Sequence, residues 1–148
     1  GGAREGVLNG SPSVGFSLLD QRHDANFEPA RAFVRQIVRQ VVQFGLPTGT
    51  FLNVNIPAEE MLKGIRVCRQ AHGKWVEEFM EREDPRKEKY YWLTGAYKNL
   101  EPEATDTDEY ALTHGFVSVV PCHLDITDHP AIEQLKNQSY EMSVNGVY

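Results

Sequence analysis

Cysteine is scarce in this chain, which has only Cys68 and Cys122 among its 148 residues. Two cysteines cannot build the disulfide framework of a small secreted domain, so we expect two buried free thiols rather than one disulfide. The first residues do not combine a charged segment with an apolar one, so no secretory signal is expected either. These features predict a cytoplasmic protein.

Long apolar runs and concentrated positive charge are also missing. No segment approaches the roughly 18 consecutive apolar residues of a membrane-spanning helix. The net charge is −6, and the basic residues of segment 81–89 alternate with acidic ones. A protein that binds the nucleic-acid backbone needs a concentrated basic face. We therefore expect no membrane and no nucleic acid polymer among the partners.

The common catalytic motifs do not occur in the sequence. It contains no Walker A loop, no G-x-G-x-x-G after a strand, no H-E-x-x-H and no G-x-S-x-G. Gly1 and Gly2 precede a predicted helix and resemble the end of an anion-binding turn, but this signal is weak by itself. The residues alone therefore indicate a soluble α/β protein without a catalytic centre of its own.

The first third of the chain alternates predicted helices and strands. Residues 3–8 favour a short helix, and the apolar run 13–19 favours a parallel strand. Asn26 is the expected N-cap of an amphipathic helix that ends at Gly45, and residues 51–56 form the next strand. This order is typical of a βαβ unit in a Rossmann-like, mostly parallel sheet, which we assign to residues 1–60.

The pattern changes after Pro57 to one typical of β-hairpins. Strands are predicted over 65–69, 75–81 and 90–93, with a turn at 84–87. Four aromatic residues on these strands need a surface to cover, because an isolated hairpin is barely stable: Trp75, Phe79, Tyr91 and Trp92. That surface is either the chain's own domain or a neighbouring subunit. We assign residues 61–148 to this hairpin-rich region.

Two groups of polar residues near the C-terminus allow more than one interpretation. The acidic segment 106–109 resembles a calcium ligand set, but Asp106 or Thr107 as an N-cap of helix 107–114 explains it better. A strand over 116–120 is expected to end at Pro121, and a last helix to begin at residue 131.

The second polar group contains four residues with side chains that can bind metals: His123, Asp125, Asp128 and His129. Their spacing matches no recurrent metal motif. We favour a structural interpretation, in which Asp125 or Thr127 caps the last helix and His129 binds a carboxylate by a hydrogen bond.

Six short motifs, in this order, resemble the SurE (survival protein E) family over nearly the whole chain. They are GAREG at 2–6, SVGFSLLD at 13–20, LNVNIP at 52–57, GIRV at 64–67, YYWLTG at 90–95 and LDITDH at 124–129. The resemblance implies a phosphomonoesterase that uses a divalent metal, Mg²⁺ or Mn²⁺, and acts on nucleoside 5′- and 3′-monophosphates.

The resemblance places the catalytic residues of the family outside this chain. The family holds its metal through a pair of Asp residues, a Ser and an Asn, and a Ser-Gly-Thr turn precedes the segment that matches residues 1–6. This sequence has no counterpart of these positions, so no catalytic and no metal-binding residue is assigned to it. We expect the chain alone to be inactive, and the alternative is an assembly module without catalysis.

The resemblance also implies assembly into homodimers or homotetramers through exchanged C-terminal elements. The hairpin of Trp75, Phe79, Tyr91 and Trp92 and the segment from Asp125 onward match the exchanged parts. Asp125 and His129 match positions near the crossover, so we expect them to act as a hinge or a subunit contact. An independent metal site between His123 and His129 is the weakest hypothesis.

Overall fold

A computed structural model describes residues 1–58 and 61–138. It confirms the α/β class. A four-stranded sheet has the order β1-β2-β8-β3, where β1 is Val14–Leu18, β2 Thr50–Ile56, β8 Phe116–His123 and β3 Gly64–Val67. The pairs β1–β2 and β3–β8 are parallel, and β2–β8 is antiparallel. The chain thus forms a mixed sheet in which two of the three pairings are parallel.

The predicted βαβ unit is present. Helix α2, Arg31–Phe44, connects the parallel strands β1 and β2 and ends at Gly45, whose φ of 71° suits glycine. The helix begins later than Asn26, which was wrongly expected to be its N-cap. Asn26 instead accepts a hydrogen bond from the Glu28 N–H (3.0 Å) in the preceding turn, and Ala30 is the N-cap.

The core lies between α2 and one face of the sheet. It consists of Ala30, Ile37, Val54, Ile56, Val117 and Val119. The opposite face carries α3, Asp108–Thr113, whose Ala111 is 1% exposed. Ser118 and Val120 are buried on that second face, because neighbouring residues of a strand point to opposite sides. The sheet therefore has a helix on each face.

Strand β8 continues past Pro121 to His123, although the proline was expected to end it. Pro121 pairs with Leu52 of β2, while β3 stops at Val67 opposite Val119. The nitrogen of Pro121 carries no hydrogen and so cannot donate a hydrogen bond toward β3. No such bond is needed, because β3 has already ended at this point. The proline is tolerated because its side of β8 is an open edge.

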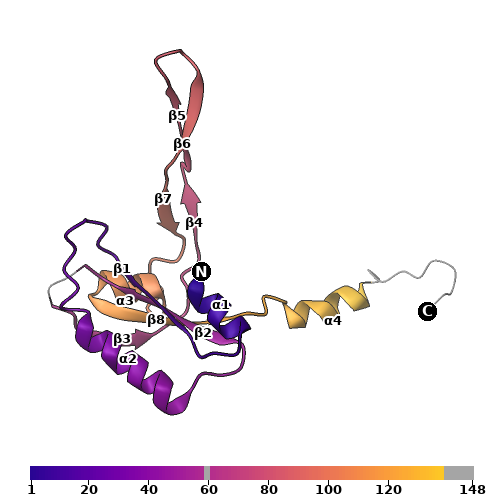
Figure 1. Cartoon of the computed structure of the whole chain (residues 1–148). Coiled ribbons are helices and arrows are strands. Elements are labelled where there is room, and N and C mark those ends of the chain that lie inside the picture. Colours follow the sequence, from indigo (N-terminus) through magenta and orange to yellow (C-terminus); the bar gives the residue numbers. More distant parts are fainter. Residues whose placement is uncertain (59–60, 139–148) are drawn as a thin grey trace.

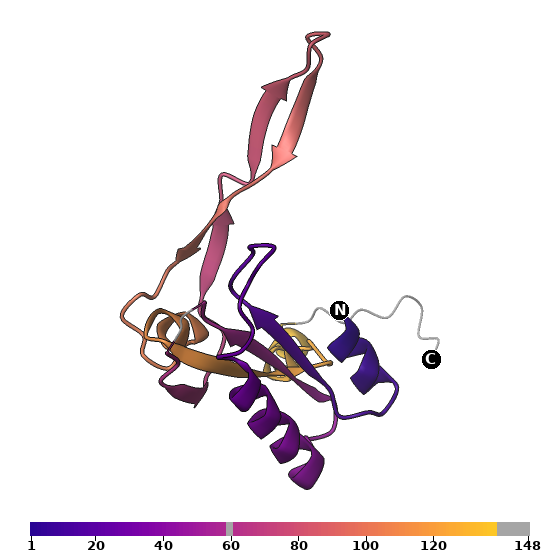
Figure 2. The same ribbon diagram turned by 60° about the vertical axis from the view of Figure 1, so that its left-hand side comes forward.

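Four short strands form an arm that rises away from the sheet, on the side opposite α2 (Figures 1 and 2). Strand β4, Gly73–Val76, pairs with β7, Ala96–Asn99; further out, β5, Phe79–Glu83, pairs with β6, Lys89–Leu93. The strand predicted over 75–81 is interrupted at Glu77, whose φ of 55° is outside the strand region. The arm is thus two successive two-stranded ladders.

Two further helices complete the described residues. Helix α1, Gly2–Leu8, packs near β1 and β2, while α4, His129–Asn137, projects sideways from the end of β8 (Figure 1). In the described ranges 1–58 and 61–138, no helix combines the length and the apolar character needed to cross a membrane. Cys68 and Cys122 are free thiols, as expected, but they are half-buried and not fully buried.

Candidate functional site

The arm exposes an unusual amount of aromatic surface. The four side chains singled out in the sequence are all more than half exposed: Trp75 59%, Phe79 67%, Tyr91 62% and Trp92 53%. Trp75 contacts the ring of Tyr97 edge-on, with centroids 6.1 Å apart. The chain's own domain does not cover the other three, so one of the two expected covering surfaces is excluded for them within the part of the chain that the structure describes.

Both faces of the outer ladder carry apolar side chains. Phe79 pairs with Leu93 and points to one face, while Met80 pairs with Trp92 and points to the other. Leu93 is 80% exposed and Met80 is 45% exposed. A two-stranded ladder cannot bury either face by itself, so both faces are available for contact with another molecule.

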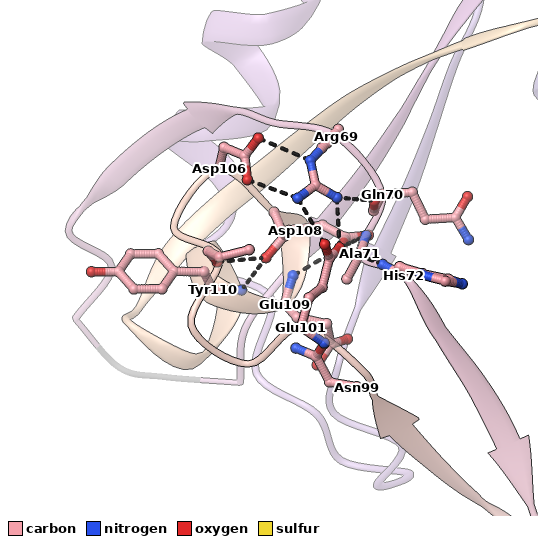
Figure 3. Close-up of polar contacts among 12 residues, drawn as sticks. Arg69, Gln70, Ala71, His72, Asn99, Glu101, Asp106, Asp108, Glu109 and Tyr110 are labelled. Atoms are coloured by element: carbon pink, nitrogen blue, oxygen red, sulfur yellow. Dashed lines mark hydrogen bonds and ion pairs between the residues drawn. The ribbon is translucent and has the colours of Figure 1, made fainter.

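The base of the arm is held by one arginine (Figure 3). The guanidinium of Arg69 donates to Glu101 through Nη1 (2.6 Å) and Nη2 (3.0 Å), and to Asp106 through Nε (2.9 Å) and Nη2 (3.0 Å). Arg69 follows β3 and precedes the arm, while Glu101 and Asp106 come after the arm. The two chain segments at the base of the arm are therefore tied together by paired, charge-assisted hydrogen bonds.

Backbone groups extend this network. Glu101 also accepts from the His72 N–H (2.6 Å), and Asp108 accepts from the Ala71 N–H (2.8 Å). Thr107 is the N-cap of α3, since its hydroxyl accepts from the Tyr110 N–H (3.2 Å). Of the two predicted caps, Thr107 is thus the correct one. The acidic segment binds backbone and Arg69 groups of its own chain.

The sequence pattern does not single out Arg69 or Glu101 as functional residues. The two residues are 32 positions apart, and neither belongs to a motif. Only the excess of acid in 101–109 could have suggested a partner, and nothing in the pattern selects Arg69 from the other basic residues.

The hydrogen bonds of this network lower the pKa of its carboxyl groups. Hydrogen bonds from Arg69 and then from the His72 N–H lower the pKa of Glu101 to about 2. Hydrogen bonds from Arg69 also lower the pKa of Asp106, and both acids raise the pKa of Arg69. The three side chains are therefore charged together at neutral pH.

We expect the base of the arm to loosen in acid. The pKa of Glu101 is lower in the folded chain than its ordinary value of 4.5. The ionised Glu101 carboxylate therefore stabilises the folded state above pH 4.5, and this stabilisation is lost as the pH falls from 4.5 toward about 2. Amide hydrogen exchange at His72 should accelerate in this range relative to that at Val54. In an Arg69→Met variant the acid-induced change should be much smaller, and an equal change would contradict the assignment.

A second set of polar contacts forms the joint before α4. Asp125 Oδ2 lies 2.8 Å from His129 Nε2, and Asp125 Oδ1 accepts from the Thr127 N–H (2.9 Å). Hydrogen bonds from Thr127 and then from His129 hold the pKa of Asp125 well below its usual range. The expected hydrogen bond between His129 and a carboxylate is therefore present.

The cap of α4 differs from the prediction. Asp128, and neither Asp125 nor Thr127, is the N-cap, and its Oδ1 accepts from the Ala131 N–H (3.1 Å). The helix begins at His129, two residues earlier than expected, because Pro130 is well suited to the first helical turn. Asp125 therefore does not cap the helix, and its carboxylate binds Thr127 and His129 in the joint.

The joint does not fit a metal ion. Within residues 1–58 and 61–138 no three His, Cys, Asp or Glu side chains are placed to bind one ion. At the joint, Asp128 caps the helix, while Asp125 and His129 bind each other. The residues present therefore do not suit the divalent ion implied by the resemblance, and no catalytic step can be assigned to them.

The mixed sheet, the projecting arm and the polar joint together define an α/β protein with a long hairpin appendage. Residues 1–77 match the family model described as Survival protein SurE. The chain therefore belongs to the SurE family.

Individual relatives agree with this assignment. The "5′-nucleotidase SurE" of Christiangramia forsetii is 50% identical over 139 residues, covering 93% of this chain and 53% of the relative. That of Phocaeicola vulgatus is 44% identical over 138 residues, covering 93% and 54%. A crystal structure of SurE protein from Aquifex aeolicus is 35% identical with a TM-score of 0.73, covering 93% of this chain and 55% of that one. The chain spans about half the length of the curated relatives it matches.

Proposed function

We propose that this chain is the supporting and subunit-joining half of a SurE-type nucleotidase that hydrolyses nucleoside 5′- and 3′-monophosphates. The observation that carries the proposal is the 50% identity to a protein named 5′-nucleotidase SurE, which extends over 93% of the chain. The catalytic groups and the Mg²⁺ or Mn²⁺ ion belong to the part of the family that this chain does not cover. Hydrolysis of 5′-AMP after the chain is joined to that part of a relative tests the proposal.

The contribution of this chain is assembly into a homodimer or homotetramer. The support is the arm, whose Phe79, Tyr91 and Trp92 are exposed and whose base is held by Arg69. Exposed aromatic clusters of this kind favour contact with another protein surface. A cytoplasmic location belongs to the same proposal and is supported by the two free thiols.

An assembly module without catalysis is the second candidate. It is favoured by the same arm, together with the misfit between the described residues and a metal ion. The two candidates differ in one measurement, because only the nucleotidase gains turnover when the rest of the family length is supplied.

The joint before α4 is proposed as the hinge that directs this helix toward a second subunit. Its support is the Asp125–His129 hydrogen bond, together with the exposure of two apolar residues: Ile126 (90%), in the loop between the bonded residues, and Leu135 (42%), on α4. Loss of that bond should let α4 change its orientation relative to the sheet, and it removes no side chain from the core.

We therefore expect His129→Ala to weaken the dimer more than the fold. A lost charge-assisted hydrogen bond should raise the dimer dissociation constant by about tenfold, while the melting temperature of the sheet changes little. Sedimentation velocity over a concentration series measures the first, and circular dichroism measures the second. His23→Ala, at another exposed histidine, is the control, and an unchanged sedimentation profile for His129→Ala would count against the hinge.

A further inference from the structure

The strands β1 and β2 end together at one edge of the sheet. They are adjacent and parallel, with Leu18 opposite Ile56 as the last pair. In open α/β sheets, ligands bind in the crevice outside the carboxyl ends of the strands. The loop that follows β1 at this edge begins with Asp20 and Arg22 and returns to α2. This is the part of the chain where a substrate of an α/β protein is expected.

A small pocket lies at this edge. Its polar lining comes from Asp20, Arg22 and Asn26, and Leu18, Ile56 and Leu62 contribute apolar walls. Its volume of about 80 Å³ is well below the roughly 300–1,000 Å³ of a pocket for a drug-sized ligand. The pocket therefore suits a small polar group and not a whole nucleoside.

One edge of the Arg22 guanidinium is fixed by Asp20. Nε donates to Asp20 Oδ1 (2.9 Å) and Nη2 to Oδ2 (2.7 Å), and the backbone N–H of Arg22 also donates to Oδ1 (3.0 Å). The Asp20 side chain is 9% exposed, whereas that of Arg22 is 72% exposed. These bonds lower the pKa of Asp20 to about 2, so the carboxylate stays charged at neutral pH.

The other edge of the guanidinium is available to a ligand. An arginine has five N–H donors, and a carboxylate that binds Nε and Nη2 leaves the fork of Nη1 and Nη2 unused. Among the residues that the structure describes, Asp20 is the only hydrogen-bonding partner of the Arg22 side chain. That fork matches two oxygens of a phosphate group, and its orientation is already fixed by a nearly buried acid.

We propose that Arg22 binds the phosphate group of the substrate through Nη1 and Nη2, with Asp20 as its positioning residue. This inference rests on the proposed nucleotidase function and deepens it, because it names a residue of this chain that contacts the phosphoryl oxygens. It also gives the pocket a role, since a phosphate is a small polar group.

The competing explanation is that the Asp20–Arg22 pair only stabilises the loop. The two explanations predict different phosphate binding by the Arg22→Lys variant. Lysine keeps the charge beside Asp20, so a loop-stabilising ion pair survives, but it has no second donor edge for a bidentate contact. A loss of phosphate binding in the lysine variant therefore indicates the fork and not the ion pair.

The test is a titration of the 148-residue chain with inorganic phosphate, followed by NMR of the Arg22 Nε–H and the backbone amides of the loop. The native chain should show saturable shifts at Arg22 and Asn26. Arg22→Gln and Arg22→Lys should each weaken phosphate binding by about tenfold or more. Arg39→Gln, at an exposed arginine of α2, is the matched control and should bind like the native chain.

Two outcomes would overturn the inference: no saturable shift at Arg22 in the native chain, or equal phosphate binding by both Arg22 variants and the Arg39 control. Circular dichroism of each variant shows whether the fold is kept, which the 72% exposure of Arg22 predicts. The result is separable from the proposed function, because phosphate binding is measured without turnover. Turnover by the completed protein that is unaffected by Arg22→Gln would reject the inference and leave the nucleotidase function in place.

Discussion

Joined to the part of the Christiangramia forsetii relative that it does not cover, this chain is expected to release phosphate from 5′-AMP in the presence of Mn²⁺, whereas the 148-residue chain alone should release none. The chain covers 53% of that relative at 50% identity, so the two parts should pack as in one protein. The described residues offer no group of three metal-binding side chains. The difference should be close to all-or-none, because enzymes accelerate reactions by at least about 10⁶-fold.

Three controls make this result specific. Removal of the divalent ion with EDTA should abolish turnover in the joined protein and addition of Mn²⁺ should restore it, because an ion held by the other part would supply Lewis-acid chemistry that this chain lacks. The uncovered part of the relative, expressed alone, shows how much activity depends on this chain. 3′-AMP measured beside 5′-AMP tests the wider substrate range.

Either of two results would refute the proposed division of roles, in which this chain supports assembly and the rest of the family length supplies the catalytic groups. Turnover by the 148-residue chain alone would show that its own residues form a catalytic centre. A joined protein that folds and assembles but has no turnover would favour the assembly module without catalysis.

Removal of the outer ladder of the arm is expected to abolish the larger assembly while leaving the sheet folded. Val76 and Ala96 are the outermost pair of the ladder between β4 and β7, so an Asn-Gly turn can replace residues 77–95 and close a tight hairpin there. The deletion removes Phe79, Tyr91 and Trp92, each of which is more than half exposed. At roughly 1.5–3 kcal/mol for each large apolar side chain buried at a contact, their loss should weaken association by several orders of magnitude.

Sedimentation velocity of the native and shortened chains measures this effect, and thermal melting shows that the sheet is intact. Phe79→Ser and Trp92→Ser change opposite faces of the outer ladder, so comparing them identifies which face is buried in the assembly. Glu83→Ser, at a polar position of the same ladder, is the matched control. Identical sedimentation of the native and shortened chains would exclude the arm as a subunit contact.

Local sequence signals were sufficient for the elements whose stabilising contacts are close in the chain. The apolar spacing along α2, the glycine at Gly45 and the Thr107 cap each involve residues within about four positions. The first two were predicted correctly, and Thr107 was one of two predicted caps. The α/β class and the aromatic hairpin followed from the same short-range patterns. The start of α2 was missed because Asn26 can accept a backbone hydrogen bond equally well in a turn.

Residues that are far apart in the chain required the tertiary structure. Arg69 meets Glu101 only because the arm returns to its starting point, and the pattern of either segment gives no sign of the other. Pro121 lies inside a strand because β3 happens to end beside it. Glu77 interrupts the predicted strand, and its φ of 55° shows where the inner ladder gives way to the outer one.

The sequence by itself determined the fold class, the family resemblance and the residues that would form an arm, because hydrophobic period, turn residues and caps act over a few positions. Only the tertiary structure decided that the arm's aromatic side chains stay uncovered by their own domain, and that one guanidinium closes its base. It also placed Asp20 and Arg22 at the edge where two parallel strands end. These features depend on which distant segments meet, and that is set by the packing of the sheet as a whole.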